Sequence, residues 1–163
     1  MEEMMEAMEC EAAAALLQFF YTSKLEVTTD PAAACAEFLL QMMEVADRWQ
    51  APLALTALSS VLCKLQPDLF PTAAAYSLPE TLQTAPAFAQ VKARALASLL
   101  AVFGDAVAVA TSHTLVRDFV NLPAAAVHTL LRNDALVTDA EATVLLLLSE
   151  WRAKSFLQQS GNP

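Results

Sequence analysis

Glycine is scarce in this chain. Gly104 and Gly161 are the only two among 163 residues. Tight hairpin turns need a positive φ and therefore favour glycine, so the sequence offers few places for a β-hairpin. Alanine and leucine, both strong helix formers, are abundant, and apolar residues make up 56% of the chain, enough to bury a core. We expect an all-α fold with one short strand at most, over residues 24–29, where polar and apolar residues alternate.

Basic residues are also scarce. Nine Lys and Arg residues stand against 18 Asp and Glu, which gives a net charge of −9. The basic residues are scattered singly, so no patch can neutralise a phosphate backbone, and we expect no nucleic-acid partner. Uninterrupted apolar runs fall short of the roughly 18–20 residues that span a bilayer, and the acidic N-terminus is unlike a signal peptide. We therefore expect no membrane association and a cytoplasmic or nuclear location.

Residues that bind metals or cofactors are few and isolated. Cys10, Cys35 and Cys63 lie far apart, no CxxC pair occurs, and His113 and His128 stand alone. This spacing does not match a zinc site, and free cysteine is most often a buried, reduced thiol. The chain also has no glycine-rich phosphate loop. We expect neither a metal nor a cofactor.

A catalytic constellation is difficult to assemble from this sequence. Ser112 and His113 with Asp105 are the closest approach to a nucleophile, a base and an orienting acid, but no glycine-flanked elbow or oxyanion loop accompanies them. The carboxylates of Asp139 and Glu141 are better explained as part of a helix cap. We expect that the protein is not an enzyme.

Apolar residues recur at spacings of three and four through most of the chain, which predicts amphipathic helices. Residues 77–80 and 138–141 match capping boxes, and Gly104-Asp105 is expected to break or bend a long helix. Trp151 and Leu148 are predicted core residues, because they belong to the most apolar segment. The expected helices cover residues 1–22, 31–49, 52–65, 88–110, 114–120, 123–131 and 144–151.

The first predicted helix carries an unusual group of methionines. Met4, Met5 and Met8 share a helical face with Leu16. A methionine stripe can mark a promiscuous partner groove; the interpretations we favour are a core position or a helix that continues without a neighbour to pack on. In the second case the exposed apolar face predicts self-association or a partner that completes the domain.

Two segments resemble the C-terminal half of BTB/POZ domains. The run Leu16-Leu17-Gln18-Phe19-Phe20-Tyr21-Thr22-Ser23-Lys24-Leu25 is followed by the segment LLQMMEVADRW at residues 39–49. Together they are similar to the family pattern LLxFxYTGxL … LLxxADxxxxxxL. Ser23 stands where the family usually has glycine, and no β-rich half resembling the start of such a domain precedes these segments.

A second resemblance follows in the same chain. The sequence FVNLP at residues 119–123, the stretch 130–137 and the stretch 141–151 are similar to the BACK-domain pattern FxxLPxxxLxxLLxxDxLxVxxExxVxxxLxxW. The two resemblances imply a C-terminal part of a BTB/POZ-like domain over residues 1–66. They further imply a BACK-like helical bundle over residues 67–157, with a frayed tail at 158–163.

The resemblance also implies a function. Proteins of this type act as substrate adaptors, which connect the cullin scaffold of a RING-type E3 ubiquitin ligase to the substrates of that ligase. The alternative is an oligomerisation or docking scaffold that binds no cullin. Tyr21 has two open interpretations. Aromatic side chains are usually buried, which predicts a core position with the hydroxyl at the rim, whereas the resemblance implies a contact with a partner. The partner-binding residues implied by the resemblance are Leu17 and Tyr21 on one surface and Leu69, Phe70, Leu78 and Leu82 on a second.

Overall fold

The fold is all-α. The computed structural model describes residues 2–22 and 32–160, with side chains at residues 10–22, 36–67 and 69–154. Within these ranges there is no β-strand, and one isolated parallel bridge joins Asp105 to Val137. The expected strand over residues 24–29 and the expected helix start at Asp30-Pro31 lie outside the described residues. The last helix extends to Ser160, so residues 158–160 of the expected frayed tail are helical.

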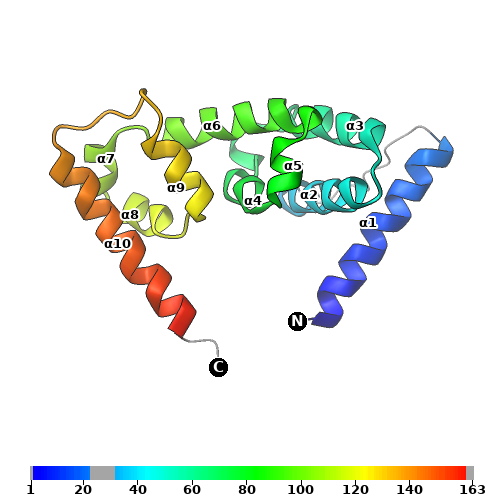
Figure 1. Cartoon of the computed structure of the whole chain (residues 1–163), viewed down its shortest axis with the longest axis horizontal. Helices are drawn as coiled ribbons and strands as arrows, with labels where there is room; N and C mark the ends of the chain where they lie inside the picture. Colours follow the sequence, from blue (N-terminus) through cyan, green and yellow to red (C-terminus); the bar gives the residue numbers. More distant parts are fainter. Residues whose placement is uncertain (1, 23–31, 161–163) are drawn as a thin grey trace. The chain divides into compact units, whose positions relative to one another are not determined.

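Helices of very different lengths follow one another along the chain (Figure 1). The order is α1 (Glu2–Thr22), α2 (Ala32–Arg48), α3 (Pro52–Leu62), the 3₁₀ turn η1 (Pro67–Leu69), α4 (Thr72–Ser77), α5 (Glu80–Thr84), the 3₁₀ turn η2 (Pro86–Phe88), α6 (Ala89–Phe103), α7 (Ala106–Thr111), α8 (His113–Phe119), α9 (Ala124–Leu131) and α10 (Glu141–Ser160).

The chain divides into two compact units. Unit 1 is Met1–Ala95 and unit 2 is Leu96–Pro163, so the division falls inside α6. The boundary expected between residues 66 and 67 lies within unit 1, where the prolines near η1 connect two packed helical segments instead of separating two bodies. The assignment of these segments to BTB-like and BACK-like domains stays a prediction.

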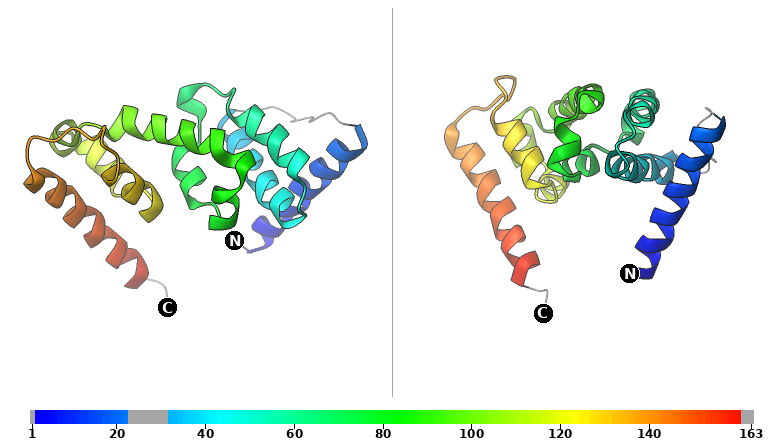
Figure 2. Two further views of the ribbon diagram at one scale, coloured as in Figure 1. Left: turned by 45° about the horizontal axis from the view of Figure 1, so that its top comes forward. Right: turned by 45° about the vertical axis from the view of Figure 1, so that its right-hand side comes forward.

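Unit 1 is built around α2, which packs against α1 on one side and α3 on the other (Figure 2). The buried positions of α2 recur at helical spacing, as expected for a helix between two neighbours. Ala12 and Leu16 of α1 are fully buried. The largest fully buried side chains of the unit are Leu16, Leu39, Met42, Met43, Leu58, Leu62, Leu82, Phe88 and Val91.

A tight turn connects α2 to α3. Gln50 has a φ of +53°, and the amide of Ala51 donates to the Ala46 carbonyl at 2.9 Å, a backbone bond of the kind that closes a helix C-terminus. Pro52 then occupies the first turn of α3, as the sequence predicts. Leu53, next to it, is 81% exposed, because the buried face of α3 follows the register of Leu55, Leu58 and Leu62.

Arg94 on α6 holds the end of α3 in place. Its guanidinium donates to the carbonyls of Cys63 and Leu65 and lies 5.1 Å from the centre of the Phe70 ring. Carbonyls at a helix C-terminus have no partner within the helix, and a guanidinium satisfies them with several donors at once. We call this arrangement the Arg94 clamp.

Unit 2 begins with a break that the sequence predicts. A Cβ at Gly104 would lie 2.3 Å from the carbonyl oxygen of Leu100, so only glycine fits where α6 ends. The Asp105 side chain then accepts bonds from the amides of Val107 and Ala108, each at 3.0 Å, and caps α7. The expected break at Gly104-Asp105 is therefore confirmed.

Neither predicted capping box forms. Ser77 is the last residue of α4, and its hydroxyl donates back to the Ala73 carbonyl at 3.2 Å. The Thr138 hydroxyl donates to the Ala140 carbonyl at 2.8 Å instead of accepting a bond from the start of α10. The Thr143 hydroxyl donates to the Asp139 carboxylate at 2.7 Å, which lowers the pKa of Asp139. The hydroxyls of Ser77 and Thr138 thus bond to backbone carbonyls instead of the amides they were expected to cap.

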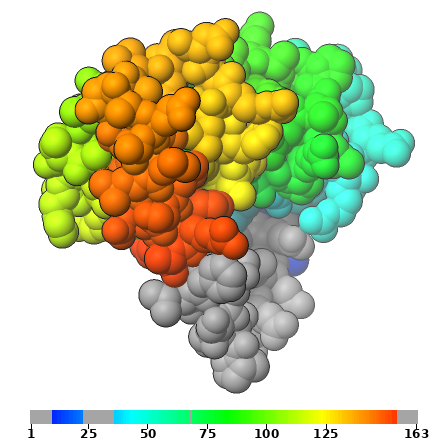
Figure 3. Space-filling model, turned by 60° about the vertical axis from the view of Figure 1, so that its left-hand side comes forward, coloured from blue at the N-terminus to red at the C-terminus, as the bar shows by residue number. Residues whose placement is uncertain are grey.

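The core of unit 2 includes α10 only in part. Leu147 is buried, whereas Leu148 and Trp151 are half-buried, so their predicted core positions are only partly right. The Trp151 ring nitrogen donates to the Leu122 carbonyl at 2.8 Å. Leu145 and Leu146 are exposed, and Figure 3 shows α10, in orange, at the surface of this unit.

One described segment is long and apolar enough to cross a membrane by length and composition. It is Pro86–Phe103, with 18 residues and a mean hydropathy of 1.2. A helix that contributes to a protein core passes the same test, and Val91, Ala95 and Leu99 of this segment are buried. The finding is weak as an indication of a membrane span.

Candidate interaction surface

The C-terminal half of α1 has two contrasting faces. Ala12 and Leu16 have no exposed surface, because this face packs on α2. The next residue, Leu17, is 50% exposed, and Phe20 and Tyr21 are 45% and 89% exposed. Adjacent residues on a helix point about 100° apart, so consecutive leucines belong to different faces.

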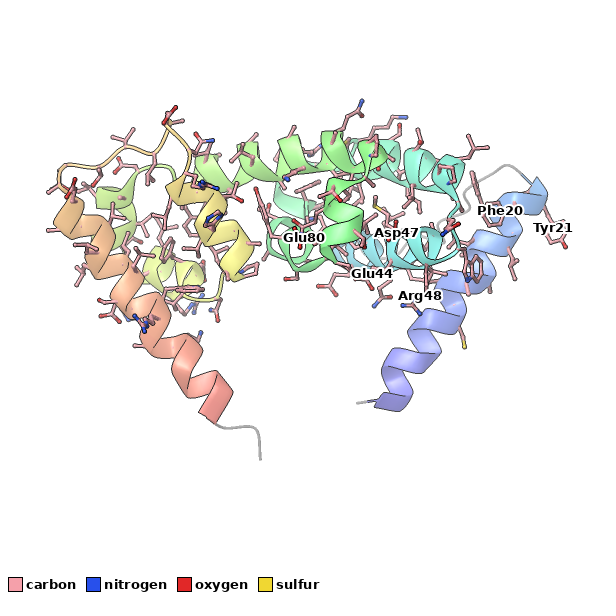
Figure 4. All side chains as sticks on the ribbon, viewed as in Figure 1. Phe20, Tyr21, Glu44, Asp47, Arg48 and Glu80 are labelled. Carbon is pink, nitrogen blue, oxygen red and sulfur yellow. The ribbon has the colours of Figure 1, made fainter. Side chains whose placement is uncertain are left out.

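The exposed side forms one continuous stripe. We define the outer face of α1 as Cys10, Ala14, Leu17, Phe20 and Tyr21, all exposed and spaced by three or four residues. Figure 4 shows Tyr21 at the end of α1, pointing away from the rest of unit 1. The expectation of a core position for Tyr21 is wrong. The alternative interpretation, a tyrosine accessible to a partner, agrees with its exposure.

The apolar face expected from the methionines is different. Leu16 is buried against α2, which agrees with the core interpretation of the stripe at this residue. The side chains of Met4, Met5 and Met8 lie outside the described residues. Among the described side chains of α1, the large exposed apolar ones are Leu17, Phe20 and Tyr21. Phe20 was not predicted as a surface residue.

The second surface implied by the resemblance is largely core. Phe70 and Leu78 are 6% exposed, and Leu82 has no exposed surface. Leu69 is half-buried. Leu78 at the end of α4 and Leu82 in α5 face inward, and Phe70, which follows η1, lies against Arg94. The prediction that Phe70, Leu78 and Leu82 contact a partner is therefore wrong. A buried side chain cannot contact another protein unless part of unit 1 unfolds.

Two exposed apolar residues at the α2–α3 turn were not predicted as surface residues. Trp49 is 44% exposed and Leu53 is 81% exposed. They are spaced by four residues, the spacing of neighbours on a helix surface, although Gln50 interrupts the helix between them. Counting the helical register from the buried positions of α3 would have predicted that Leu53 is exposed.

Charged side chains lie on the neighbouring helices of unit 1. Figure 4 shows Glu44, Asp47 and Arg48 on α2 and Glu80 on α5. The Thr81 hydroxyl donates to the Asp47 carboxylate at 3.3 Å, which links α5 to α2. In the described part of the chain, no group of three His, Cys, Asp or Glu side chains is placed to hold a metal ion.

The residues nearest to a catalytic set serve as helix caps. Asp105 caps α7, and the Ser112 hydroxyl accepts a bond from the Leu115 amide at 3.4 Å and caps α8. This capping accounts for both side chains without any chemistry at His113. The expectation that the protein is not an enzyme stays a prediction.

The cysteines have different surroundings. Cys10 is exposed and Cys63 is half-buried, and both are free thiols; the expected burial is therefore wrong for Cys10. Burial raises the pKa of Cys63, while the nearby Arg94 guanidinium opposes this shift. The side chain of Cys35 lies outside the described residues.

Unit 2 contains a small apolar cavity. Phe103 and Phe119, whose ring centres are 5.9 Å apart, line it together with Leu147. Its volume of about 10 Å³ is at the lower limit for a single water molecule. It is a packing defect and not a ligand site.

The outer face of α1 is thus the best candidate for a functional surface among the described residues. It combines two aromatic rings and a leucine at the end of a helix whose other face is packed. No family model, no curated protein and no solved structure matches the chain.

Proposed function

We propose that the chain is a non-catalytic protein-interaction module that docks its partner on the outer face of α1. The observation that carries the proposal is the joint exposure of Leu17, Phe20 and Tyr21, at 50%, 45% and 89%. Aromatic and aliphatic side chains grouped in this way supply most of the binding energy when a partner covers them.

The more specific proposal is a substrate adaptor of a cullin–RING E3 ubiquitin ligase, acting in the cytoplasm or nucleus. Its support is the BTB-like sequence pattern together with the exposure of Leu17 and Tyr21, the two residues that the resemblance assigns to the cullin-facing surface. Such an adaptor performs no chemistry. It holds two proteins together, so an accessible apolar anchor is the feature it requires.

A second candidate is an oligomerisation or docking scaffold that binds no cullin. Burial of Phe70, Leu78 and Leu82 favours it, because only one of the two surfaces implied for cullin binding is then accessible. In this case the same outer face of α1 receives a different protein.

Light scattering coupled to size exclusion separates the two candidates. The chain is run alone and with a cullin N-terminal domain. The adaptor proposal expects a co-eluting complex, and Tyr21→Ala is expected to weaken it about tenfold, as truncation of a buried aromatic anchor does. Leu145→Ala, at a 65% exposed position on α10, is the matched control and should leave the complex unchanged. Absence of a complex with the unmodified chain rejects the adaptor and leaves the scaffold.

A further inference from the structure

The connection between α9 and α10 covers residues 132–140 and is the longest in the described part of unit 2 (Figure 1). Seven of its nine side chains are exposed, and the other two, Asn133 and Leu136, are half-buried. A connection with so little buried surface depends on a few specific contacts to stay in place. We call residues 132–140 the strap.

Two backbone bonds hold the middle of the strap on the junction between α6 and α7. The Val137 amide donates to the Gly104 carbonyl at 2.8 Å, and the Ala106 amide donates to the Val137 carbonyl at 2.9 Å. These bonds form the isolated bridge between Asp105 and Val137. The Val137 side chain is 62% exposed, so the backbone and not the side chain attaches the strap at this residue.

Leu136 supplies the apolar part of the attachment. Among the apolar side chains of the strap, it is the one that is half-buried. It lines the small cavity of unit 2, whose other walls include Phe103, Ala106 and Phe119. Ala106 is only 2% exposed. The strap therefore forms one wall of an apolar cavity whose remaining walls belong to helices.

Bonds within the strap preserve its own shape. The Asn133 side-chain oxygen accepts a bond from the Ala135 amide at 2.9 Å, and the Asn133 carbonyl accepts one from the Leu136 amide at 3.1 Å. The Thr138 hydroxyl donates to the Ala140 carbonyl at 2.8 Å. Since donor and acceptor of these three bonds both lie in the strap, the bonds can persist when the strap moves as a whole.

Helix α7 keeps most of its N-terminal cap without the strap. The first amides of a helix have no partner within the helix. The Val137 carbonyl serves Ala106, whereas the Asp105 carboxylate serves Val107 and Ala108. When the strap leaves, two of these three amides stay bonded and the Ala106 amide becomes free to bind water. Movement of the strap therefore does not require α7 to unfold.

We infer that residues 132–140 open as one element, independently of the helices of unit 2, and that this opening exposes the apolar cavity to solvent. Local openings of this kind occur where little apolar surface has to be uncovered and the freed backbone groups reach water. The closed strap keeps water from the cavity walls. This inference concerns unit 2 alone and does not depend on the partner proposed for α1.

Hydrogen exchange of the folded full chain tests the opening. After correction for intrinsic rates, we expect equal protection at the Ala106 and Val137 amides, at least about tenfold below that of the Val109 and Val127 amides of α7 and α9. Equal protection at all four amides would show that the strap opens only when unit 2 unfolds. Different protection at Ala106 and Val137 would show that the strap does not open as one element. Either result overturns the inference.

A variant at Leu136 tests what holds the strap closed. Leu136→Ala removes the side chain that lines the cavity, and we expect about tenfold faster exchange at Ala106 and Val137 with little change at Val127. Val137→Ala shortens the exposed neighbouring side chain and is the matched control; exchange at Ala106 should stay the same. If Leu136→Ala accelerates exchange at Val127 equally, Leu136 stabilises the whole unit and the strap is not a separate element.

Thiol labelling tests whether the opening reaches the cavity. Ala106→Cys places a thiol in the cavity wall, and Ala126→Cys places one at a fully buried position of α9 outside that wall. Mass mapping separates these thiols from the native cysteines. We expect Ala106→Cys to be labelled at least about tenfold faster than Ala126→Cys, and Leu136→Ala to accelerate only the first reaction. Equal labelling rates would show that both thiols are reached by unfolding of unit 2, which contradicts the inference.

Discussion

The two units of the chain are stabilised by different means. Unit 1 contains nine of the twelve largest fully buried side chains among the described residues, whereas Val109, Leu99 and Leu130 are the three in unit 2. The helices α3, α4 and α5 of unit 1 begin without a side-chain cap. In unit 2, Asp105 and Ser112 cap α7 and α8, whereas α9 begins without a side-chain cap.

The contrast follows from helix length and neighbours. Helices shorter than about 12–15 residues are marginal in water, so α7 and α8 depend on local polar bonds as well as on packing. In unit 1 the long helix α2 has buried residues from Ala36 to Ala46, and the short α4 and α5 are held through their buried apolar side chains. The uncapped α9 of unit 2 is likewise held by packing, through the buried Ala126, Val127 and Leu130.

The largest effect should come from the core of unit 1. Leu58→Ala is expected to lower the free energy of unfolding by about 3 kcal/mol, because it removes a fully buried side chain and leaves a cavity. Leu53→Ala on the same helix removes an 81% exposed side chain. This variant should change the free energy of unfolding by less than about 0.5 kcal/mol. Urea unfolding measures both. Similar losses in the two variants would contradict the core described for α3.

The Arg94 clamp is the polar exception within unit 1, and its loss should have an intermediate effect. Arg94→Met keeps much of the side-chain volume but leaves the Cys63 and Leu65 carbonyls without these donors. We expect a loss of about 2 kcal/mol, as for hydrogen bonds to a charged group. Thermal unfolding at one pH is the measurement, and Lys92→Met, at an exposed position of α6, is the control. Full rescue by Arg94→Lys would show that charge alone, and not the planar guanidinium, holds the two carbonyls.

The smallest effect should come from the caps of unit 2. Asp105→Ala removes the acceptor for the Val107 and Ala108 amides, and we expect a loss of about 1 kcal/mol. Hydrogen exchange should show faster exchange at those two amides. Asp134→Ala, at an exposed turn position, should leave them unchanged. If Asp105→Ala lowers the free energy of unfolding as much as Leu58→Ala does, the contrast drawn between the two units is wrong.

Local chemistry explains which parts of the fold were predictable. The break at Gly104-Asp105 and the start of α3 at Pro52 depend on residues adjacent in sequence, and both were predicted correctly. The capping boxes at Ser77 and Thr138 are also local patterns, but these hydroxyls bond to carbonyls within four residues of them. A motif does not reveal which of two nearby partners a hydroxyl selects.

The candidate surface was only partly predictable because it depends on how α1 meets α2. The register alone allows either Leu16 or Leu17 to face inward, and the packing on α2 decides between them. The resemblance implied Leu17 and Tyr21 as contact residues, whereas the exposure of Phe20 depends on the packing of α1 on α2 and was not predicted. The Arg94 clamp was also missed, because its partners Cys63 and Leu65 are 31 and 29 residues away in sequence.

The turn at Gln50 shows what a shortage of glycine means for this protein. A side chain held at a φ of +53° costs about 1 kcal/mol relative to glycine in the same conformation. The protein has therefore not reached the highest stability that its own backbone allows. Replacing Gln50 by glycine in the turn between α2 and α3 would therefore stabilise the fold, and this gain can offset a mildly destabilising substitution elsewhere.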